Sequence, residues 1–325
     1  MTHTNHLVSV IIPCYNSEIY LSDCLFSLLN QTYTNWEAIC VNDGSKDNTE
    51  SILQQFAQKD SRFKVISQSN AGVSAARNKA LSMCEGEYIC FVDSDDMIHV
   101  NFLEALLSLM TNEVELTICN FTRKISAPSA VETVKTTWVN NASDCAKKIL
   151  LDKTFHPQIC CMLFKREVIV QHQLLFFLGC ARGEDWEFFM KYLLHIPKVA
   201  YTSVVLYYYR INDASAMASL NENSLTSIGA SQRVAAYYEQ YNSPVKDTIK
   251  QYAVSRTLWK FLILSLLRHN TIIYKQLTQN YNTQEELRKL ISYPGKAERI
   301  LSRLFLISEV TFRWSFYLLG YFHKH

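Results

Sequence analysis

The chain has 325 residues, of which 48% are hydrophobic and 19% are charged, as in an ordinary folded protein. Lys and Arg number 32 against 30 Asp and Glu, so the net charge of +2 gives no general reason to expect nucleic acid as a partner. A chain of this length usually exceeds a single core, which predicts a main domain with a smaller second region.

The cysteine and histidine patterns favour neither a disulfide framework nor a zinc site. The ten cysteines are scattered without a C-x-x-C pair, and several lie in apolar runs such as "YICFVD". This usage is typical of reduced, buried thiols in the cytoplasm. The N-terminal "MTHTNHLVSVIIP" lacks the basic flank and long apolar core of a signal peptide, so we expect a cytoplasmic protein.

Up to residue 121, short β-branched and apolar runs alternate with segments of helical period. The expected strands are residues 8–12, 36–42, 63–67, 87–93 and 114–121, and the expected helices are 17–31, 46–58, 72–84 and 99–110. Strand and helix in alternation predict an α/β domain whose strands pair mostly in parallel, with right-handed crossovers.

Four polar clusters follow the first four expected strands: "PCYN", "NDGS", "SNAG" and "DSDD". Parallel strands bring their carboxyl ends to one edge of the sheet, which is where ligands bind in such folds. Because loops are polar in any protein, plain turns would also account for these clusters.

Beyond residue 121 the pattern weakens. We expect a strand at 131–139, a helix at 142–152, an apolar segment at 160–164, a helix in 183–196 and a strand at 204–212, followed by amphipathic helices from 221 onward. The predicted organisation is an α/β, ligand-binding domain over 1–215 and a helical C-terminal region over 216–325.

The "DSDD" cluster places the carboxylates of Asp93, Asp95 and Asp96 together, where each raises the pKa of the others unless a cation or hydrogen-bond donors compensate. The chain contains neither G-x-G nor Gly-Lys-Ser/Thr, which disfavours a glycine-rich phosphate cradle. A divalent metal held by Asp93 and Asp95 is the remaining way to bind a diphosphate here. Asp96 is expected to be a helix cap or turn residue.

Five segments in order, "SVIIPCYN", "VNDGSKDNT", "QSNAGVSAARNKAL", "FVDSDD" and "GEDWEF", resemble the successive signatures of the family 2 glycosyltransferases over about the first 215 residues. The resemblance implies a GT-A (Rossmann-like) fold and inverting, Mn²⁺- or Mg²⁺-dependent transfer of a hexose or N-acetylhexosamine from a UDP-sugar. The implied acceptor is a hydroxyl of a glycan or lipid-linked molecule in bacterial surface polysaccharide or lipopolysaccharide synthesis.

The resemblance also implies roles for individual residues. The nucleobase would lie against Pro13 and Tyr15, Asp43 would accept the uracil N3–H, Asn70 and Gly72 would shape a loop, Arg77 would reach the phosphates, and Asp93, Ser94 and Asp95 would bind the nucleotide sugar and metal. Each residue also has an ordinary structural alternative, such as a turn, a helix start or a solvated arginine.

On the acceptor side, the resemblance implies that Asp185 in "GEDWEF" is the catalytic base, with Arg182, Glu184 and Trp186 at its border. A helix-start carboxylate stabilised by the helix dipole is the competing interpretation. The segment Tyr207 to Arg210 with "NDASAM" (212–217) resembles a segment that closes over the donor, although three consecutive tyrosines also suit a packed strand.

The C-terminal third combines wide apolar faces with basic residues, as in "GKAERILSRLFLISEVTFRW". Such helices suit peripheral contact with the inner face of the plasma membrane, or packing on the main domain or on a second subunit. Two rival functions also fit an α/β carboxylate site: a sugar nucleotidyltransferase, and a catalytically silent glycosyltransferase-like scaffold.

Overall fold

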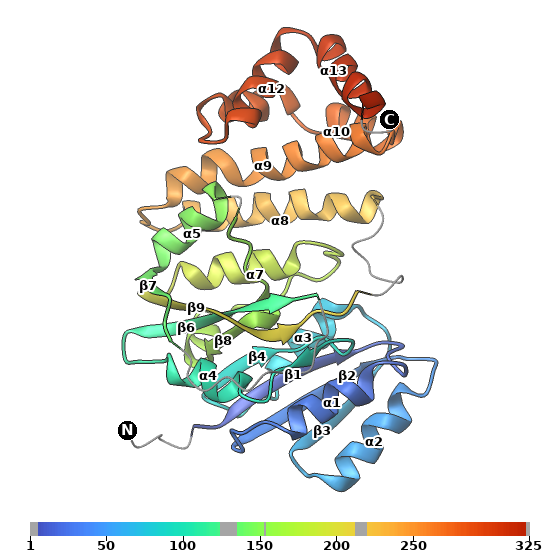
Figure 1. Cartoon of the computed structure of the whole chain (residues 1–325), viewed down its shortest axis with the longest axis vertical. Coiled ribbons are helices and arrows are strands. Elements are labelled where there is room, and N and C mark those ends of the chain that lie inside the picture. The colour runs from blue at the N-terminus through green and yellow to red at the C-terminus, as the bar shows by residue number, and fades with distance from the viewer. Residues whose placement is uncertain (1–5, 124–134, 153, 212–219, 323–325) are drawn as a thin grey trace. The chain divides into compact units, whose positions relative to one another are not determined.

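The computed structural model describes residues 6–123, 135–152, 154–211 and 220–322 (Figure 1). These residues form two compact units. The first comprises Met1–Cys145, Pro157–Gly179 and Tyr192–Asn212, and the second comprises Ala146–His156, Cys180–Lys191 and Asp213–His325. Two short segments that precede residue 215 therefore group with the C-terminal helices.

The first unit contains all the strands of the described chain. The strands are β1 (Val8–Cys14), β2 (Trp36–Asp43), β3 (Phe63–Gln68), β4 (Tyr88–Phe91), β5 (Met97–Ile98), β6 (Val114–Thr122), β7 (Trp138–Asn141), β8 (Met162–Lys165) and β9 (Lys198–Tyr208). The helices among them are α1 (Leu21–Leu29), α2 (Thr49–Lys59), α3 (Val73–Leu81), α4 (Phe102–Ser108) and α6 (Arg166–Gln171).

The strands form one sheet in the order β3-β2-β1-β4-β8-β6-β9-β5, with β7 paired to β9. β1 pairs in parallel with β2 and β4, so that Val8 lies opposite both Trp36 and Tyr88. The predicted α/β fold with a mostly parallel sheet is confirmed. β8 enters antiparallel between β4 and β6, which strand and helix alternation could not predict because β8 follows β6 by some forty residues.

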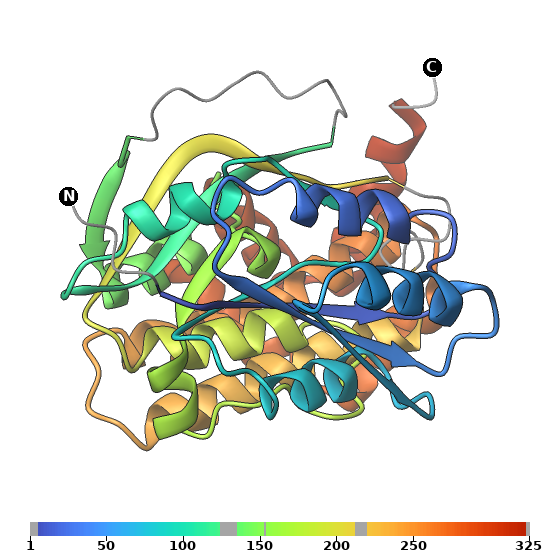
Figure 2. The same ribbon diagram turned by 90° about the horizontal axis from the view of Figure 1, so that it is seen from below.

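The sheet is covered by helices on both sides because its central strands alternate between two buried faces. Val8, Val10 and Ile12 of β1 belong to a core that also contains residues of α1, α2 and α4. The intervening Ile11 is also fully buried, and α3 packs on β1 and β2 from that opposite side. Figure 2 shows α1 and α4 on one side of the strands and α3 on the other.

The second unit is helical, as expected for the C-terminal region. It contains α8 (Glu222–Glu239), α9 (Lys246–Leu267), α10 (Thr271–Asn280), α11 (Thr283–Lys289), α12 (Lys296–Ile307) and α13 (Glu309–Phe322), together with most of α5 (Ala142–Leu151) and α7 (Glu184–Leu193). α8 and α9 run side by side (Figure 1). None of the described helices is both long and apolar enough to cross a membrane.

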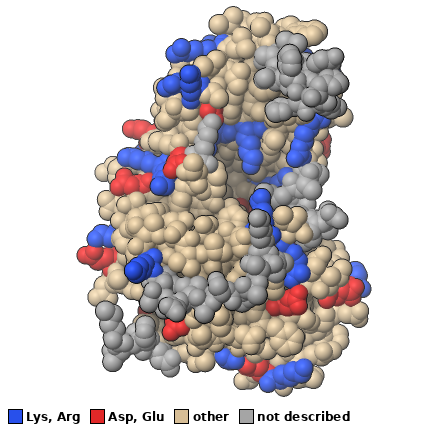
Figure 3. All heavy atoms as spheres, viewed as in Figure 1, with Lys and Arg blue, Asp and Glu red and all other residues tan. Residues whose placement is uncertain are grey.

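Charge is distributed without a dominant sign on the surface in view. On the described part of the face drawn in Figure 3, basic and acidic side chains are scattered among larger uncharged areas. A nucleic-acid-binding surface typically gathers Lys and Arg into a continuous stripe or patch. The described part of this face carries no such stripe.

Two histidine rings of the first unit stack on each other. The His172 and His195 centroids lie 3.6 Å apart, and burial followed by the charge of His172 lowers the pKa of His195 to about 4. A histidine whose folded pKa lies below its ordinary value of about 6.5 stabilises the fold above that pH, and this stabilisation is lost as the pH falls from 6.5 toward 4.

We therefore expect the free energy of unfolding to decrease by about 1 kcal/mol between pH 7 and pH 5, a value reduced for solvent screening because the ring is partly exposed. Urea denaturation at pH 7 and at pH 5 measures this difference in the free energy of unfolding. The variant His195→Gln should lose this part of the pH dependence, and an unchanged dependence in the variant would contradict the assignment.

Candidate active site

The carboxylate at the end of β2 fastens the loop that precedes α3. Asp43 accepts hydrogen bonds at Oδ1 from Gln68 Nε2 (2.8 Å) and Ala71 N (2.9 Å), and at Oδ2 from Gly72 N (2.8 Å). Asn70 Nδ2 donates to the Asp43 carbonyl at 3.0 Å. A carboxylate can accept about four hydrogen bonds, so Asp43, although only 3% exposed, has the capacity to accept one more.

Two glycines allow this loop to approach β2 closely. Gly44 has φ +72°, and a Cβ at this position would lie 2.7 Å from Asn70 N. Gly72 has φ +87° and precedes the first residue of α3. Both positions therefore favour glycine, which adopts positive φ without steric cost.

The end of β1 presents an aromatic ring at the same edge of the sheet. Pro13 lies within β1, and Tyr15, which directly follows the strand, is 52% exposed. The adjacent Ser17 shares a 2.7 Å hydrogen bond with Ser94, both side chains being buried. This bond ties the loop after β1 to the "DSDD" turn, and the exposed Tyr15 ring is suited to stacking on a flat base.

Arg77 is not a solvated helix arginine. Its guanidinium donates from Nη2 to Asp93 Oδ1 at 3.0 Å and lies 5.2 Å from the centre of the Phe176 ring, and only 5% of the residue is exposed. Asp93 itself is partly exposed, and no described residue donates a hydrogen bond to its Oδ2. Arg77 therefore orients one carboxylate oxygen while the other stays available.

Asp96 differs from its expected role as a helix cap, because Asn101 occupies the N-cap of α4. The turn is found, since Asp96 N donates to Asp93 O at 3.0 Å. The Asp96 carboxylate is buried and accepts from Tyr207 Oη (2.7 Å) and from Arg210 N (2.8 Å). Burial, followed by the charge of Asp93, raises its pKa to about 8.

Tyr207 of β9 and Arg210, which follows the strand, hold the "DSDD" turn. Tyr207 is fully buried, and its hydroxyl accepts from Asp93 N at 3.2 Å. Arg210 donates from Nε to the Asp95 carbonyl and from Nη2 to Asp23 Oδ2, each at 2.9 Å. The tyrosine thus packs within the sheet, and the segment 212–217 lies outside the described residues.

In the second unit, α7 is anchored on α8 at both ends of its first turn. The Arg182 carbonyl accepts from Thr226 Oγ1 (3.2 Å) and Ser227 Oγ (3.1 Å). Glu187, which is 1% exposed, accepts two hydrogen bonds from Arg233 Nε and a third from Nη2 at 2.7 Å. These contacts fix the direction in which the start of α7 presents its side chains.

Asp185 lies in this first turn and is partly exposed. Its Oδ1 accepts from Trp186 N at 2.7 Å, and no described residue pairs with Oδ2. Glu184 is buried. Burial, followed by the charge of Arg182, lowers the pKa of Lys260 of α9, whereas the charge of Asp185 raises it. Asp185 therefore lies among basic groups of the second unit.

Within the described residues, no three His, Cys, Asp or Glu side chains are placed to hold a metal ion by themselves. Mg²⁺ commonly uses only one or two protein carboxylates and completes its coordination with substrate phosphates and water. Asp93, with one uncommitted oxygen, and Asp95, two residues further on, supply such a pair. The residues present therefore fit a metal that binds together with a diphosphate.

The first unit thus brings together the residues predicted for the donor, since β2, β1 and β4 are neighbours and end at one edge. The residues predicted for the acceptor side, Arg182, Glu184, Asp185 and Trp186, belong to the second unit. Sequence reasoning missed the supporting roles of Gln68 and Phe176 in the first unit and the presence of Lys260 near Asp185 in the second. Gln68 opens the quoted segment "QSNAGVSAARNKAL" but received no role there, and no quoted motif contains Phe176 or Lys260.

Comparison with known proteins gives a consistent result. The family model for glycosyl transferase family 2 matches residues 9–172. EpsH of Bacillus subtilis (strain 168), described as a glycosyltransferase, is 33% identical over 251 residues, which cover 75% of this chain and 72% of EpsH.

Two solved structures share the fold. Staphylococcus aureus TarS 1–349 in complex with UDP-GlcNAc aligns with a TM-score of 0.71 at 19% identity, over 94% of this chain and 89% of TarS 1–349. The mannosyltransferase PcManGT from Pyrobaculum calidifontis, in complex with GDP-Man and Mn²⁺, aligns with a TM-score of 0.53 at 15% identity, over 98% of this chain and 88% of PcManGT. With its family match and this fold, the chain belongs to glycosyl transferase family 2 and is a GT-A glycosyltransferase.

Proposed function

We propose that this glycosyltransferase is metal-dependent and inverting, and that it transfers a sugar from a UDP-sugar to a hydroxyl of a glycan or lipid-linked acceptor in bacterial surface polysaccharide synthesis. One observation carries the proposal. The edge at which β1, β2 and β4 end carries an exposed aromatic ring, Tyr15, a loop-bound carboxylate, Asp43, and the Asp93–Asp95 pair with Arg77.

On the donor side, each group has a task that suits its geometry. Pro13 and the exposed Tyr15 ring would cover one face of the base, while the remaining acceptor direction of Asp43 would receive the N3–H of uracil. Asn70 and Gly72 belong to the loop that Asp43 fastens at this edge. TarS, which shares the fold, was solved with UDP-GlcNAc, and this supports a UDP-sugar as donor.

Asp93 and Asp95 would hold the metal, and Ser94 between them is fixed by its hydrogen bond to Ser17. A divalent cation bound there would neutralise the negative charge that develops on the departing diphosphate. Arg77 orients Asp93 and would add positive charge beside the departing diphosphate. The Mn²⁺ bound by PcManGT, a protein of similar fold, supports this choice of metal.

Asp185 would act as the base. Its Oδ2 is uncommitted among the described residues, so it can accept the proton of the attacking hydroxyl as the new glycosidic bond forms. A single displacement of this kind inverts the anomeric carbon and gives a β linkage from an α-linked UDP-hexose. Arg182, Glu184 and Trp186 would border the acceptor.

The test is UDP release from a panel of UDP-sugars in the presence of candidate acceptors, with GDP-sugars in parallel. Release that EDTA abolishes and added Mn²⁺ restores is the expected result. Activity only with GDP-sugars, or activity insensitive to EDTA, would contradict the proposal. A nucleotidyltransferase would instead release pyrophosphate from a nucleoside triphosphate, and a silent scaffold would bind UDP without turnover.

The cysteines support a cytoplasmic site of action. All ten are free and buried, and they pack as small apolar side chains in the described chain. Buried free thiols in such number suit a reducing compartment better than an oxidising one.

A further inference from the structure

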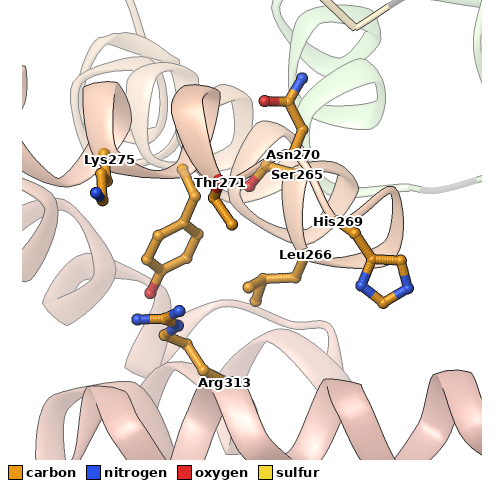
Figure 4. A pocket seen from close by; sticks show the side chains of 8 residues that line it. Ser265, Leu266, His269, Asn270, Thr271, Lys275 and Arg313 are labelled. Carbon is orange, nitrogen blue, oxygen red and sulfur yellow. The ribbon is translucent and has the colours of Figure 1, made fainter.

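A pocket of about 290 Å³ lies in the second unit, among the end of α9, the start of α10 and α13 (Figure 4). It belongs to neither the donor nor the acceptor residues described above. Its lining consists of Ser265, Leu266, His269, Asn270, Thr271, Tyr274, Lys275 and Arg313. The lining surface is therefore divided about equally between polar and apolar atoms, and it includes two cationic side chains.

Both cations lack an acidic partner. Neither the Lys275 nor the Arg313 side chain forms an ion pair or hydrogen bond with a residue that the structure describes, and the buried Arg313 Nε is without a hydrogen-bond acceptor. The Arg313 guanidinium lies 5.3 Å from the Tyr274 ring centre. Tyr274 Oη in turn donates to Glu309 Oε1 at 3.0 Å, so the nearest carboxylate on α13 is engaged by the tyrosine.

The start of α10 adds to the positive field of the pocket. Asn270 is the N-cap, its side chain accepting from Ile273 N at 3.0 Å, and Thr271 is the first residue of the helix. A helix N-terminus carries partial positive charge and attracts anions. Together with Lys275 and Arg313, this arrangement favours a phosphate group.

Exposed apolar residues lie close in the sequence to the lining residues. Leu267 (51% exposed) and Ile272 (69%) flank the turn between α9 and α10, next to Leu266 and Thr271 respectively. Val310 (64%) and Trp314 (63%) are four residues apart on α13 and share a face. An exposed apolar group of this kind usually marks a contact surface, and tryptophan is enriched where proteins meet lipid headgroups.

We propose that this pocket, together with Leu267, Ile272, Val310 and Trp314, docks the protein on a membrane that contains anionic phospholipid. The lipid phosphate occupies the pocket beside Lys275 and Arg313, and the four apolar side chains enter the headgroup boundary. Charge complementarity favours a lipid as the ligand, because the unpaired cations can bind its phosphate while the apolar side chains contact its acyl chains. This combination is typical of binding at a membrane interface. The proposal does not depend on the donor or on the metal.

Vesicle flotation of the full chain tests it. We expect binding to vesicles of phosphatidylglycerol and phosphatidylcholine, and little binding to phosphatidylcholine alone. Lys275→Gln with Arg313→Gln should weaken binding to the anionic vesicles by roughly 30-fold, because each basic residue at an anionic surface contributes about fivefold. Ile272→Ser with Trp314→Ser should weaken it independently, and circular dichroism verifies that each variant is folded.

A charge-matched control lies at the other end of α9. Lys246→Gln with Lys250→Gln removes the same two charges and should leave vesicle binding nearly unchanged. Three results would overturn the docking proposal. They are an equal loss of vesicle binding in this control, equal binding of the protein to neutral and anionic vesicles, and complete inhibition of vesicle binding by soluble glycerol phosphate. The proposal would also be overturned by a folded chain that binds no vesicles but forms a dimer that Ile272→Ser with Trp314→Ser dissociates, since the surface would then belong to a second copy.

Discussion

Replacing Asp185 with asparagine is expected to lower kcat for sugar transfer by about 100-fold to 10,000-fold, the usual contribution of a general base, and to leave UDP affinity unchanged. The amide keeps the size of the side chain and can still accept from Trp186 N through its oxygen, but it cannot take up a proton at neutral pH. Steady-state transfer rates and calorimetric UDP binding measure the two quantities.

A matched control separates catalysis from helix stabilisation. Asp247 also lies in the first turn of a helix of the second unit, α9. If Asp185 only stabilised a helix N-terminus, Asp185→Asn and Asp247→Asn would cost a similar few tenths of a kcal/mol to 1 kcal/mol in stability, with little effect on kcat. A large loss of kcat in Asp185→Asn alone is the outcome that supports the base.

The second large effect is expected for Asp95→Asn. Removing one of two carboxylates should reduce kcat/KM by at least about 100-fold, because a bound divalent metal stabilises developing charge by several kcal/mol. UDP affinity measured with Mn²⁺ should fall, whereas the weak affinity measured in EDTA should be similar to that of the unaltered protein. Calorimetry with and without Mn²⁺ gives both values.

Asp60→Asn provides the control for Asp95→Asn. Asp60 is a carboxylate of the same unit that pairs with Arg62 at 2.7 Å, at the end of α2, so its loss changes the net charge equally without touching the sheet edge. Metal-dependent UDP binding should therefore fall in Asp95→Asn and remain nearly intact in Asp185→Asn. An equal loss of metal-dependent UDP binding in Asp95→Asn and Asp185→Asn would contradict the assignment of Asp95 to the metal and Asp185 to the acceptor.

Periodicity was sufficient for the first half of the sheet. β1, β2 and β3 lie within one or two residues of their predicted bounds, because period-2 and period-3.6 patterns report local backbone geometry and burial. β4 is shorter than predicted, ending at Phe91, because the turn closed by the bond from Asp96 N to Asp93 O begins two residues later. Parallel pairing followed from the alternation of strands and helices.

Contacts between distant segments were beyond such patterns. The burial of Asp96 depends on Tyr207 and Arg210, which are more than 100 residues further along the chain. The position of Arg77 depends on Phe176, and that of Asp43 on a loop closed by Gln68 and Ala71. A hydrogen bond between such residues leaves no trace in hydrophobic period or local propensity.

The α/β alternation, the edge at which the polar residues gather and the helical C-terminal region could all be predicted from the sequence, since they follow from local patterning and from the geometry of parallel strands. The fold was needed to show that Asp96 is buried, that Arg77 orients Asp93, and that Lys275 and Arg313 line one pocket. Burial and charge pairing depend on which distant segments pack together, and local patterning does not report this.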